Sequence, residues 1–367
     1  MKLRYRIAGG ILGVIVIAIV SLGLVLSYDV DCVAAPEITE GVETMKGVTY
    51  RCYGSADVLE YGDVEKPVPG DNEVLVKVRA AAVNPLDWHY MRGTPYIMRL
   101  GSGIGAPKDT RIGVDYSGTV EAVGADVSRF EVGDEVFGAR SGAFAEYLVI
   151  PEDRALVLKP ANVSFEQAAA VPIAAITALQ ALRDKGSLEP GQKVLINGAS
   201  GGVGTFAVQI ARSMGAEVTG VCSTRNVEMV RSIGADHVFD YKKEDYTESD
   251  RVYDLIVDMV SNHSLSANRS VLSENGKLVI VGGASGDWLG PLMRPIGAML
   301  QNPFVDQEMV TLLARLRQGD LEALAEMMQS GDVTPVLDRS YPLSDIASAI
   351  RYSEEGHARG KIIVSIP

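Results

Sequence analysis

Three glycines at three-residue spacing, Gly198, Gly201 and Gly204, stand between a short apolar run and a stretch with helical periodicity. In a strand, glycine turn and helix of this kind, backbone N–H groups can approach a pyrophosphate at the positively polarised helix N-terminus. Glycine also permits positive φ in the turn and close packing of the helix on the strand. The spacing therefore predicts a dinucleotide-binding loop, although glycine-rich turns also join strands to helices in many other proteins.

The end of the following strand indicates which dinucleotide would bind. About 20 positions beyond the glycines, the chain reads Cys222-Ser-Thr-Arg-Asn226 and has no acidic residue. An acid there would hydrogen-bond a ribose 2′-hydroxyl and repel a 2′-phosphate, whereas hydroxyls and a guanidinium suit the phosphate. Ser223, Thr224 and Arg225 therefore favour NADP(H) over NAD(H). The alternative is that Arg225 only covers the start of a helix.

Strand-like and helix-like segments alternate around this loop at the spacing of an α/β domain. Near-continuous apolar strands that alternate with helices indicate a parallel sheet covered on both faces. Residues 166–324 are therefore expected to form one doubly wound dinucleotide-binding domain. Residues 307–330 are expected to be helical, with a break near Gly319. The expected strands are 193–197, 215–221, 237–239, 254–258 and 277–281, and the expected helices are 205–214, 226–233 and 264–272.

Residues 44–165 have a different pattern, in which short strands alternate with turns. The stretch 72–80 alternates as a half-buried strand should, and glycines punctuate 113–124 and 132–138. This pattern predicts a small β-barrel-like domain. Residues 325–367 are expected to return to that domain, because the chain ends in a further strand-like run.

Composition fits a protein of two folded domains. The chain has 367 residues and a net charge of −13, which disfavours nucleic-acid binding because phosphate contacts need basic patches. Its three cysteines, Cys32, Cys52 and Cys222, have no C-x-x-C spacing. They cannot form a four-cysteine zinc lobe, so we expect free, structural thiols and no disulfide framework.

The N-terminus carries a long apolar stretch. Residues 7–26 have no charge and would cross a hydrocarbon core of roughly 30 Å as a helix. Three basic residues precede the stretch and several acidic residues follow it, so we expect residues 1–43 to be a single-pass membrane anchor and linker. A cleaved signal peptide, with Val33-Ala-Ala35 as cleavage site, and a buried core helix are alternatives. The side of the membrane stays open.

Several motifs in family order carry a resemblance over nearly all of residues 44–367. The chain resembles the medium-chain dehydrogenase/reductase superfamily, in particular the zinc-independent quinone oxidoreductases such as the mitochondrial reticulon-interacting oxidoreductases. The resemblance implies a GroES-like β-barrel catalytic domain, a Rossmann domain, and NADPH-dependent hydride transfer to a quinone or an α,β-unsaturated carbonyl. The motifs are Ala82-Val-Asn-Pro-Leu-Asp87, Gly113-Val-Asp-Tyr-Ser-Gly118, Val132-Gly-Asp-Glu-Val136, the 197–204 loop, Val238-Phe-Asp-Tyr241 and Gly356-His-Ala-Arg-Gly-Lys361.

The same resemblance implies roles for single residues. Asn84 and Asp87 are candidates for positioning the nicotinamide or the substrate, while Tyr53 and His89 are interpreted as structural. Relatives often carry a lysine a few residues after the position of Ser223, whereas here Arg225 is the nearest cation. The implied cofactor-binding set is Asn84, Thr177, Ser200, Gly201, Gly202, Val203, Gly204, Ser223, Thr224, Arg225, Tyr241, Gly282, Gly283, Arg359, Gly360 and Lys361.

No metal site is expected. Zinc-dependent members have a cysteine near the Asn84 segment and a Gly-His-Glu where this chain has Gly113-Val-Asp115. A quinone or enone needs no Lewis acid, because hydride arrival produces a delocalised anion. A membrane-tethered NADPH-binding redox sensor or scaffold without turnover is the alternative function. Residues 288–304 are expected to roof the substrate cleft, to pack between subunits of a homodimer, or simply to form an extra core helix.

Overall fold

The computed structural model describes residues 17–283, 286–288 and 290–367. One of its sheets has six strands, in the order β10-β9-β8-β11-β12-β13, and every neighbouring pair is parallel. This is the 3-2-1-4-5-6 order of a Rossmann fold. The strands are β8 (Lys193–Asn197), β9 (Glu217–Cys222), β10 (His237–Asp240), β11 (Tyr253–Asp258), β12 (Leu272–Ile280) and β13 (Glu308–Thr311).

Helices pack on this parallel sheet, and the inner strands are apolar because both faces are covered. Val194, Ile196 and Val257 are fully buried. Helix α5 (Pro172–Leu179) contacts α6, and α10 contacts α5. The other helices are α6 (Gly202–Ser213), α7 (Val227–Ser232), α8 (Leu265–Ser270), α9 (Gly290–Gln301) and α10 (Gln318–Ser330).

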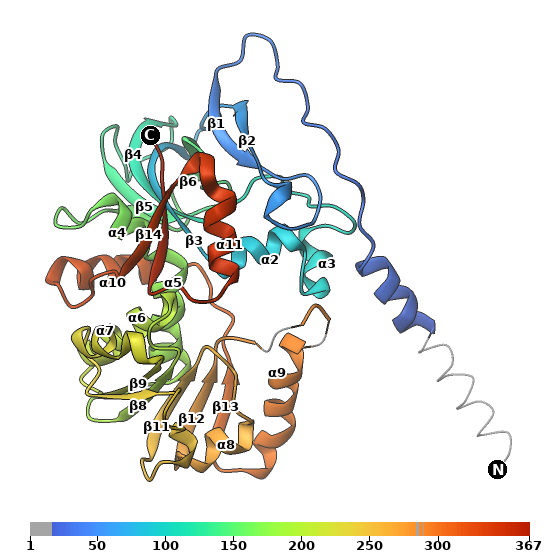
Figure 1. Cartoon of the computed structure of the whole chain (residues 1–367). Coiled ribbons are helices and arrows are strands. Elements are labelled where there is room, and N and C mark those ends of the chain that lie inside the picture. The colour runs from blue at the N-terminus through green and yellow to red at the C-terminus, as the bar shows by residue number, and fades with distance from the viewer. Residues whose placement is uncertain (1–16, 284–285, 289) are drawn as a thin grey trace, which may run out of the picture.

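The second large sheet has seven strands, in the order β14-β15-β3-β4-β5-β7, and β6 pairs with β3. The last strand of the chain pairs antiparallel with β3, at Ile362 opposite Val83. Figure 1 shows this sheet and the C-terminus above the parallel sheet. The strands are β3 (Glu73–Val83), β4 (Asp115–Val123), β5 (Glu135–Ala139), β6 (Tyr147–Pro151), β7 (Leu156–Leu158), β14 (Leu337–Pro342) and β15 (Lys361–Ser365).

Shorter elements complete this part of the chain. A hairpin of β1 (Thr44–Thr49) and β2 (Glu60–Glu65) forms a separate two-stranded sheet. The helices are α2 (Pro85–Arg92), α3 (Arg99–Ser102), α4 (Phe165–Ala169) and α11 (Ile346–Glu354). The predicted α/β class with a GroES-like and a Rossmann part agrees with this arrangement, and the division of the chain at residues 43, 165 and 324 stays a prediction.

One predicted secondary-structure element is wrong. Residues 307–330 were expected to be helical, but Glu308–Thr311 is strand β13 and the helix begins only at Gln318. Main-chain pairing of Leu278 with Met309 adds this short strand to the edge of the parallel sheet. Strand β13 has only four residues and precedes a long helix in the sequence. A pattern of four residues is too short to distinguish a strand from a helix.

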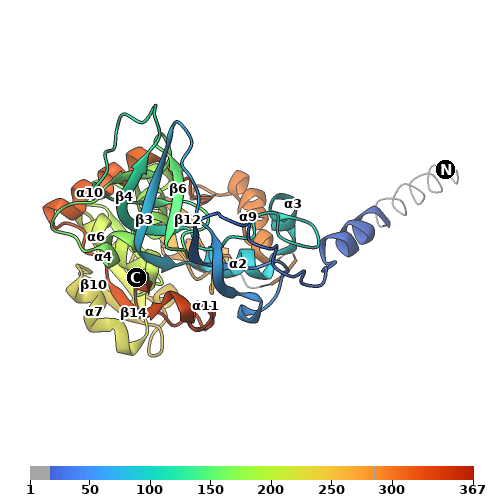
Figure 2. The same cartoon turned by 90° about the horizontal axis from the view of Figure 1, so that it is seen from above.

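The predicted membrane anchor is also wrong. Throughout the part of the chain that the structure describes, no helix has the length and apolar character that a membrane span requires. Residues 17–26 are helical and stand off from both sheets beyond α3 (Figures 1 and 2), whereas the first part of the expected span, 7–16, lies outside the described residues. This finding corrects both the predicted single-pass anchor and the membrane localisation inferred from it.

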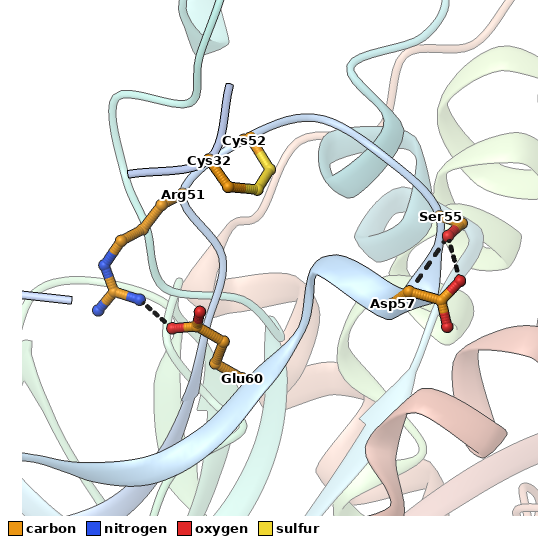
Figure 3. Close-up of a disulfide and its surroundings, with 6 residues drawn as sticks. All are labelled: Cys32, Arg51, Cys52, Ser55, Asp57 and Glu60. Atoms are coloured by element: carbon orange, nitrogen blue, oxygen red, sulfur yellow. Dashed lines mark hydrogen bonds and ion pairs between the residues drawn. A yellow bond between two sulfur atoms is a disulfide. The ribbon is translucent and has the colours of Figure 1, made fainter. Parts of the chain in front are cut away.

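The cysteines depart from prediction as well. Cys32 and Cys52 form a disulfide, with their Cα atoms 4.8 Å apart (Figure 3). Cys222, the remaining cysteine, is a free thiol, and it is buried. Arg99 binds the N-terminal segment that precedes Cys32. The Arg99 guanidinium donates to the carbonyl oxygens of Leu26 and Tyr28, at 3.0 and 3.1 Å. A contact of this kind between distant segments leaves no local signal in the cysteine spacing.

Candidate dinucleotide-binding and catalytic site

The glycine loop between β8 and α6 has no room for side chains. Gly198 has a φ of +93°, in the left-handed region, and α6 begins at Gly202 directly after its N-cap Gly201. A Cβ at Gly204 would lie 2.1 Å from the carbonyl oxygen of Gly198. The loop therefore keeps the helix N-terminus close to the strand and presents backbone N–H groups, as binding of a pyrophosphate requires.

The C-terminal segment lies against this loop. The Gly360 N–H donates to the Ser200 carbonyl oxygen at 3.0 Å, and Gly201 and Gly360 form an isolated parallel bridge. A Cβ added at Gly202 would lie 3.2 Å from Cδ of Lys361. Five residues of the predicted cofactor set are thus brought together from segments about 160 positions apart in the chain.

Lys361 also reaches the Asn84 motif. Its buried ammonium donates to Oδ1 of Asn84 at 2.6 Å and lies 3.5 Å from the carboxylate of Asp115. The Asn84 amide in turn donates from Nδ2 to Asp115, at 2.9 Å. Burial raises the pKa of Asp115 and lowers that of Lys361, and the opposite charge of each partner counters the effect.

Asp87 lies beside this group on the first turn of α2. Its Oδ2 accepts a hydrogen bond from the Asn84 N–H at 2.7 Å, which holds the helix N-terminus. Its Oδ1 is buried and has no hydrogen-bond partner among the residues that the structure describes. Burial raises the pKa of Asp87 to about 7, while the Asn84 N–H opposes the shift.

The two residues interpreted as structural are both engaged with backbone. The Tyr53 hydroxyl donates to the Gly103 carbonyl oxygen at 2.7 Å, and its ring lies 4.3 Å from the Arg99 guanidinium. Nδ1 of His89 donates to the Thr94 carbonyl oxygen at 2.7 Å. Burial lowers the pKa of His89, while the contact with Thr94 and the charge of Glu354 oppose the shift.

Thr177 lies on α5, and Gly282 lies just beyond the carboxyl end of β12. Thr177 is nearly buried on α5, and its hydroxyl donates to the Ile173 carbonyl oxygen at 2.6 Å. Gly282 follows β12, where an added Cβ would lie 2.0 Å from the carbonyl oxygen of Met259. The next glycine, Gly283, is exposed. Only glycine fits at position 282, because its backbone packs closely against Met259 at the edge where such sheets bind ligands.

The end of β9 lies near the same C-terminal segment. Ser223 is buried and its hydroxyl accepts from Asn226, whose amide also donates to Ser200 at 3.0 Å. The exposed guanidinium of Arg225 donates to the His357 carbonyl oxygen. Thr224, Tyr241 and Arg359 are exposed around this point, and Val203 is half-buried on the first turn of α6.

Sequence reasoning missed three features of this region. Asp115 was quoted only as part of a motif, yet it joins Lys361 to Asn84; its place in a strand among apolar residues was the available signal. Asp240 brings a carboxylate to the end of β10, where Lys243 pairs with it at 3.2 Å. A third feature is an aromatic contact between Tyr96 and Trp288, with ring centroids 4.6 Å apart.

This aromatic contact connects the two parts of the chain. The Tyr96 N–H donates to the Asp287 carbonyl oxygen at 2.7 Å, which joins the segment before α3 to the loop after β12. Behind the loop, Arg294 of α9 pairs with buried Asp258 at 2.5 Å. Residues 288–304 thus begin at the junction of the two parts.

Among the described residues, no three His, Cys, Asp or Glu side chains form a group that could hold a metal ion.

Comparison with known families matches both parts of this structure. Residues 70–161 match the family described as "Alcohol dehydrogenase GroES-like domain", and residues 233–364 match the family described as "Zinc-binding dehydrogenase". A chloroplast envelope quinone oxidoreductase homolog of Arabidopsis thaliana is 36% identical over 337 residues, which cover 87% of this chain and 98% of the relative. The chain belongs to the medium-chain quinone oxidoreductases.

Other relatives, named as reductases or oxidoreductases, cover the same region. The mitochondrial NAD(P)H oxidoreductase RTN4IP1 of Mus musculus is 33% identical, over 86% of this chain and 87% of the relative. A 2-methylene-furan-3-one reductase of Solanum lycopersicum is 32% identical, over 87% and 79%. Among solved structures, the quinone oxidoreductase of Coxiella burnetii superposes with a TM-score of 0.78 at 27% identity, covering 89% of this chain and all of that one.

Membership of the quinone oxidoreductase family establishes the general class of this protein. It is an oxidoreductase, and its Rossmann-type fold indicates a nicotinamide cofactor. The predicted recognition is confirmed at this level. The glycine loop, with its close backbone contact at Gly204, and the closely packed Gly282 after β12 fit the binding of a dinucleotide.

Proposed function

We propose that this protein transfers a hydride from NADPH to a quinone or an α,β-unsaturated carbonyl without the help of zinc. The observation that carries the proposal is the position of Lys361, whose side chain lies beside Gly202 of the glycine loop while its ammonium binds Asn84. This contact joins a pyrophosphate-type loop to the motif proposed for the nicotinamide. A phosphate-binding loop alone would bind nucleotide without needing such a connection.

In this proposal, residues of the protein hold the cofactor and the substrate in the orientation that hydride transfer requires. The loop 200–204 would hold the pyrophosphate, while Asn84, Thr177 and the backbone at 282–283 would bound the nicotinamide. The bound cofactor supplies the hydride, so the protein has to contribute orientation and exclusion of water. Asp87 is buried directly beside Asn84, and its position suits a structural and positioning role.

The preference for NADPH is supported by the residues at the end of β9. Ser223, Thr224 and Arg225 offer hydroxyls and a guanidinium where an NAD-preferring relative would carry an acid. Arg225 is exposed and held on the His357 carbonyl oxygen, which leaves its remaining N–H groups open to an anion. The nearby carboxylate, Asp240, is partly offset by Lys243.

The zinc-free chemistry is supported by the side chains at the positions of the family's zinc ligands. Gly113-Val-Asp115 replaces Gly-His-Glu, and its only ionisable member is already engaged. Asp115 accepts hydrogen bonds from Asn84 and from the Ile173 N–H, at 2.9 and 3.1 Å. A quinone or an enone accepts a hydride as a delocalised anion, so polarisation by a Lewis acid is not required.

The test is NADPH oxidation by the purified full-length chain. Benzoquinone, a ubiquinone analogue and a 2-alkenal serve as acceptors, and NADH is assayed in parallel. The proposal expects turnover with at least one acceptor class and a higher kcat/KM with NADPH. NADPH binding without turnover on any acceptor would contradict it and would favour the redox sensor or scaffold.

A further inference from the structure

The ammonium of Lys361 has three acceptors inside the protein. Nζ lies 2.6 Å from Oδ1 of Asn84, 3.3 Å from the Val83 carbonyl oxygen and 3.5 Å from Asp115. An ammonium has three N–H donors, so its hydrogen-bonding capacity is used within the fold. Lys361 is only 3% exposed. This geometry does not suit a lysine that binds a cofactor phosphate directly, although Lys361 belongs to the cofactor-binding set that the family resemblance implies.

We infer that Lys361 and Asp115 form a buried clamp that positions Asn84 and helix α5 for the nicotinamide. Lys361 is thus a positioning residue that acts through Asn84. The inference rests on the proposed function, because it takes Asn84 and Thr177 as the residues beside the nicotinamide. It assigns to Lys361 a role different from phosphate binding.

The clamp fixes the orientation of the Asn84 side chain. Its Oδ1 faces the Lys361 ammonium and its Nδ2 faces the Asp115 carboxylate. Exchange of the two amide atoms would place an N–H group against the ammonium and an oxygen against the carboxylate. Only one amide orientation is therefore compatible with the neighbouring charges, and the side chain is held there without rotation.

Asp115 carries the clamp to a second element. Its carboxylate accepts from the Ile173 N–H, at 3.1 Å to Oδ1 and 3.3 Å to Oδ2. Ile173 lies in the first turn of α5, where the free N–H groups and the helix dipole favour an anion. The same helix carries Thr177 one turn further on. Asp115 therefore ties Asn84 to the helix of the second residue proposed for the nicotinamide.

The aliphatic part of Lys361 extends the clamp to the glycine loop. Its Cδ lies beside Gly202, and the preceding residue, Gly360, donates to Ser200. Lys361 thus connects three parts of the proposed cofactor site: the glycine loop, Asn84 and, through Asp115, helix α5. Removal of the ammonium should leave the dinucleotide's phosphate contacts in place and loosen the nicotinamide end, because those contacts are made by the loop backbone.

The experiment compares Lys361→Met and Lys361→Gln with the wild-type full-length chain. Lys159→Met is the matched control, since Lys159 is also a nearly buried lysine, with Nζ 2.6 Å from the Val163 carbonyl oxygen and 2.9 Å from Glu135. The readouts are kcat, the Kd for NADPH, the emission of bound reduced nicotinamide, and Tm. Lys361→Gln keeps a polar side chain, so the same measurements can be made on it if Lys361→Met does not fold.

The clamp predicts that kcat falls by about 100-fold in the Lys361 variants, as for a misplaced reacting group. The Kd for NADPH should stay close to the wild-type value, and the emission of the bound nicotinamide should change. In an Asn84→Ala background, the Lys361 substitution should have almost no further effect on kcat, since the two residues act as one unit. Lys159→Met should leave kcat unchanged.

Two results would overturn the clamp. A direct phosphate ligand would raise the Kd by about 10-fold or more while kcat and nicotinamide emission stayed at wild-type values. Additive losses in the Asn84→Ala background would show that Lys361 does not act through Asn84. If the wild-type chain binds NADPH without turnover, the proposed function fails, and unchanged emission of the bound nicotinamide in the Lys361 variants would then separately refute the clamp.

Discussion

The Arg225 guanidinium donates a hydrogen bond to the His357 carbonyl oxygen, with 2.7 Å between Nη2 and the oxygen. This contact holds an exposed cation between the end of β9 and the C-terminal loop. It gives Arg225 a defined place beside Ser223, rather than that of a freely moving surface side chain. The proposed preference for NADPH depends chiefly on this residue.

Arg225→Glu is expected to lower the ratio of kcat/KM for NADPH to that for NADH by about 10- to 100-fold. The reason is the loss of a charge-assisted hydrogen bond of about 1.5–3 kcal/mol and its replacement by a like charge. Initial rates with both dinucleotides measure the ratio. Arg231→Glu is the control, because Arg231 pairs with Glu228 on α7 at 3.0 Å. An unchanged ratio in Arg225→Glu would remove the basis for the NADPH preference.

The Cys32–Cys52 disulfide should stabilise the folded chain. It closes a loop of 20 residues in sequence, and the chain-entropy account gives about 3 kcal/mol for a loop of this size. Cys32→Ser is therefore expected to lower Tm, and dithiothreitol should lower the wild-type Tm to a similar value. Thermal unfolding with and without the reductant measures both effects.

The control for this prediction is the reductant's effect on the variant. Dithiothreitol should leave the Tm of Cys32→Ser unchanged, because the remaining thiols, Cys52 and Cys222, are not joined to each other. A wild-type Tm that is insensitive to the reductant, with the disulfide shown to be reduced by mass spectrometry, would contradict the stabilising role.

Asp87 should make stability depend on pH. Burial raises its pKa from the ordinary 3.8 to about 7, so between these values the folded chain holds a proton that the unfolded chain has released. The free energy of unfolding contributed by Asp87 therefore falls as pH rises through this window, by at most about 1.4 kcal/mol per pH unit. Above the folded-state pKa the contribution becomes constant.

Asp87→Asn removes this titration and keeps an oxygen that can accept from the Asn84 N–H. The Tm of the variant relative to wild type should therefore increase as pH rises from about 5 to 7. Differential scanning fluorimetry at several pH values measures the difference. A Tm difference that is the same at every pH would show that Asp87 titrates outside the window.

The parallel sheet could be predicted from the sequence because its strands are continuous apolar runs flanked by turn signals. Lys193–Asn197 coincides with β8, and four further strands lie within a few residues of their predicted positions. The loop before α6 could also be predicted, because its glycine spacing is a pattern within a short stretch of sequence. Strand β13 was missed, since four residues at a sheet edge depend on pairing with β12 more than on their own pattern.

The parts that could not be predicted depend on contacts between distant segments. The Cys32–Cys52 disulfide follows from the docking of the 26–32 segment on Arg99, which no local motif encodes. The buried charges of Asp115 and Lys361 are 246 positions apart and meet only when β15 pairs with β3. Apolar composition over 7–26 and the charges on either side of it predicted a membrane span, and both are local patterns.

The most direct test of the central claim is a single-turnover reaction of the full-length chain with NADPH and [4-²H]NADPH. Enzyme in excess is mixed without oxygen with benzoquinone or a 2-alkenal, and the absorbance of the reduced nicotinamide is followed. Hydride transfer predicts stoichiometric loss of this absorbance with at least one acceptor and a slower loss from the hydride-face deuterated cofactor. Bound NADPH that persists unoxidised with both acceptors would contradict the account.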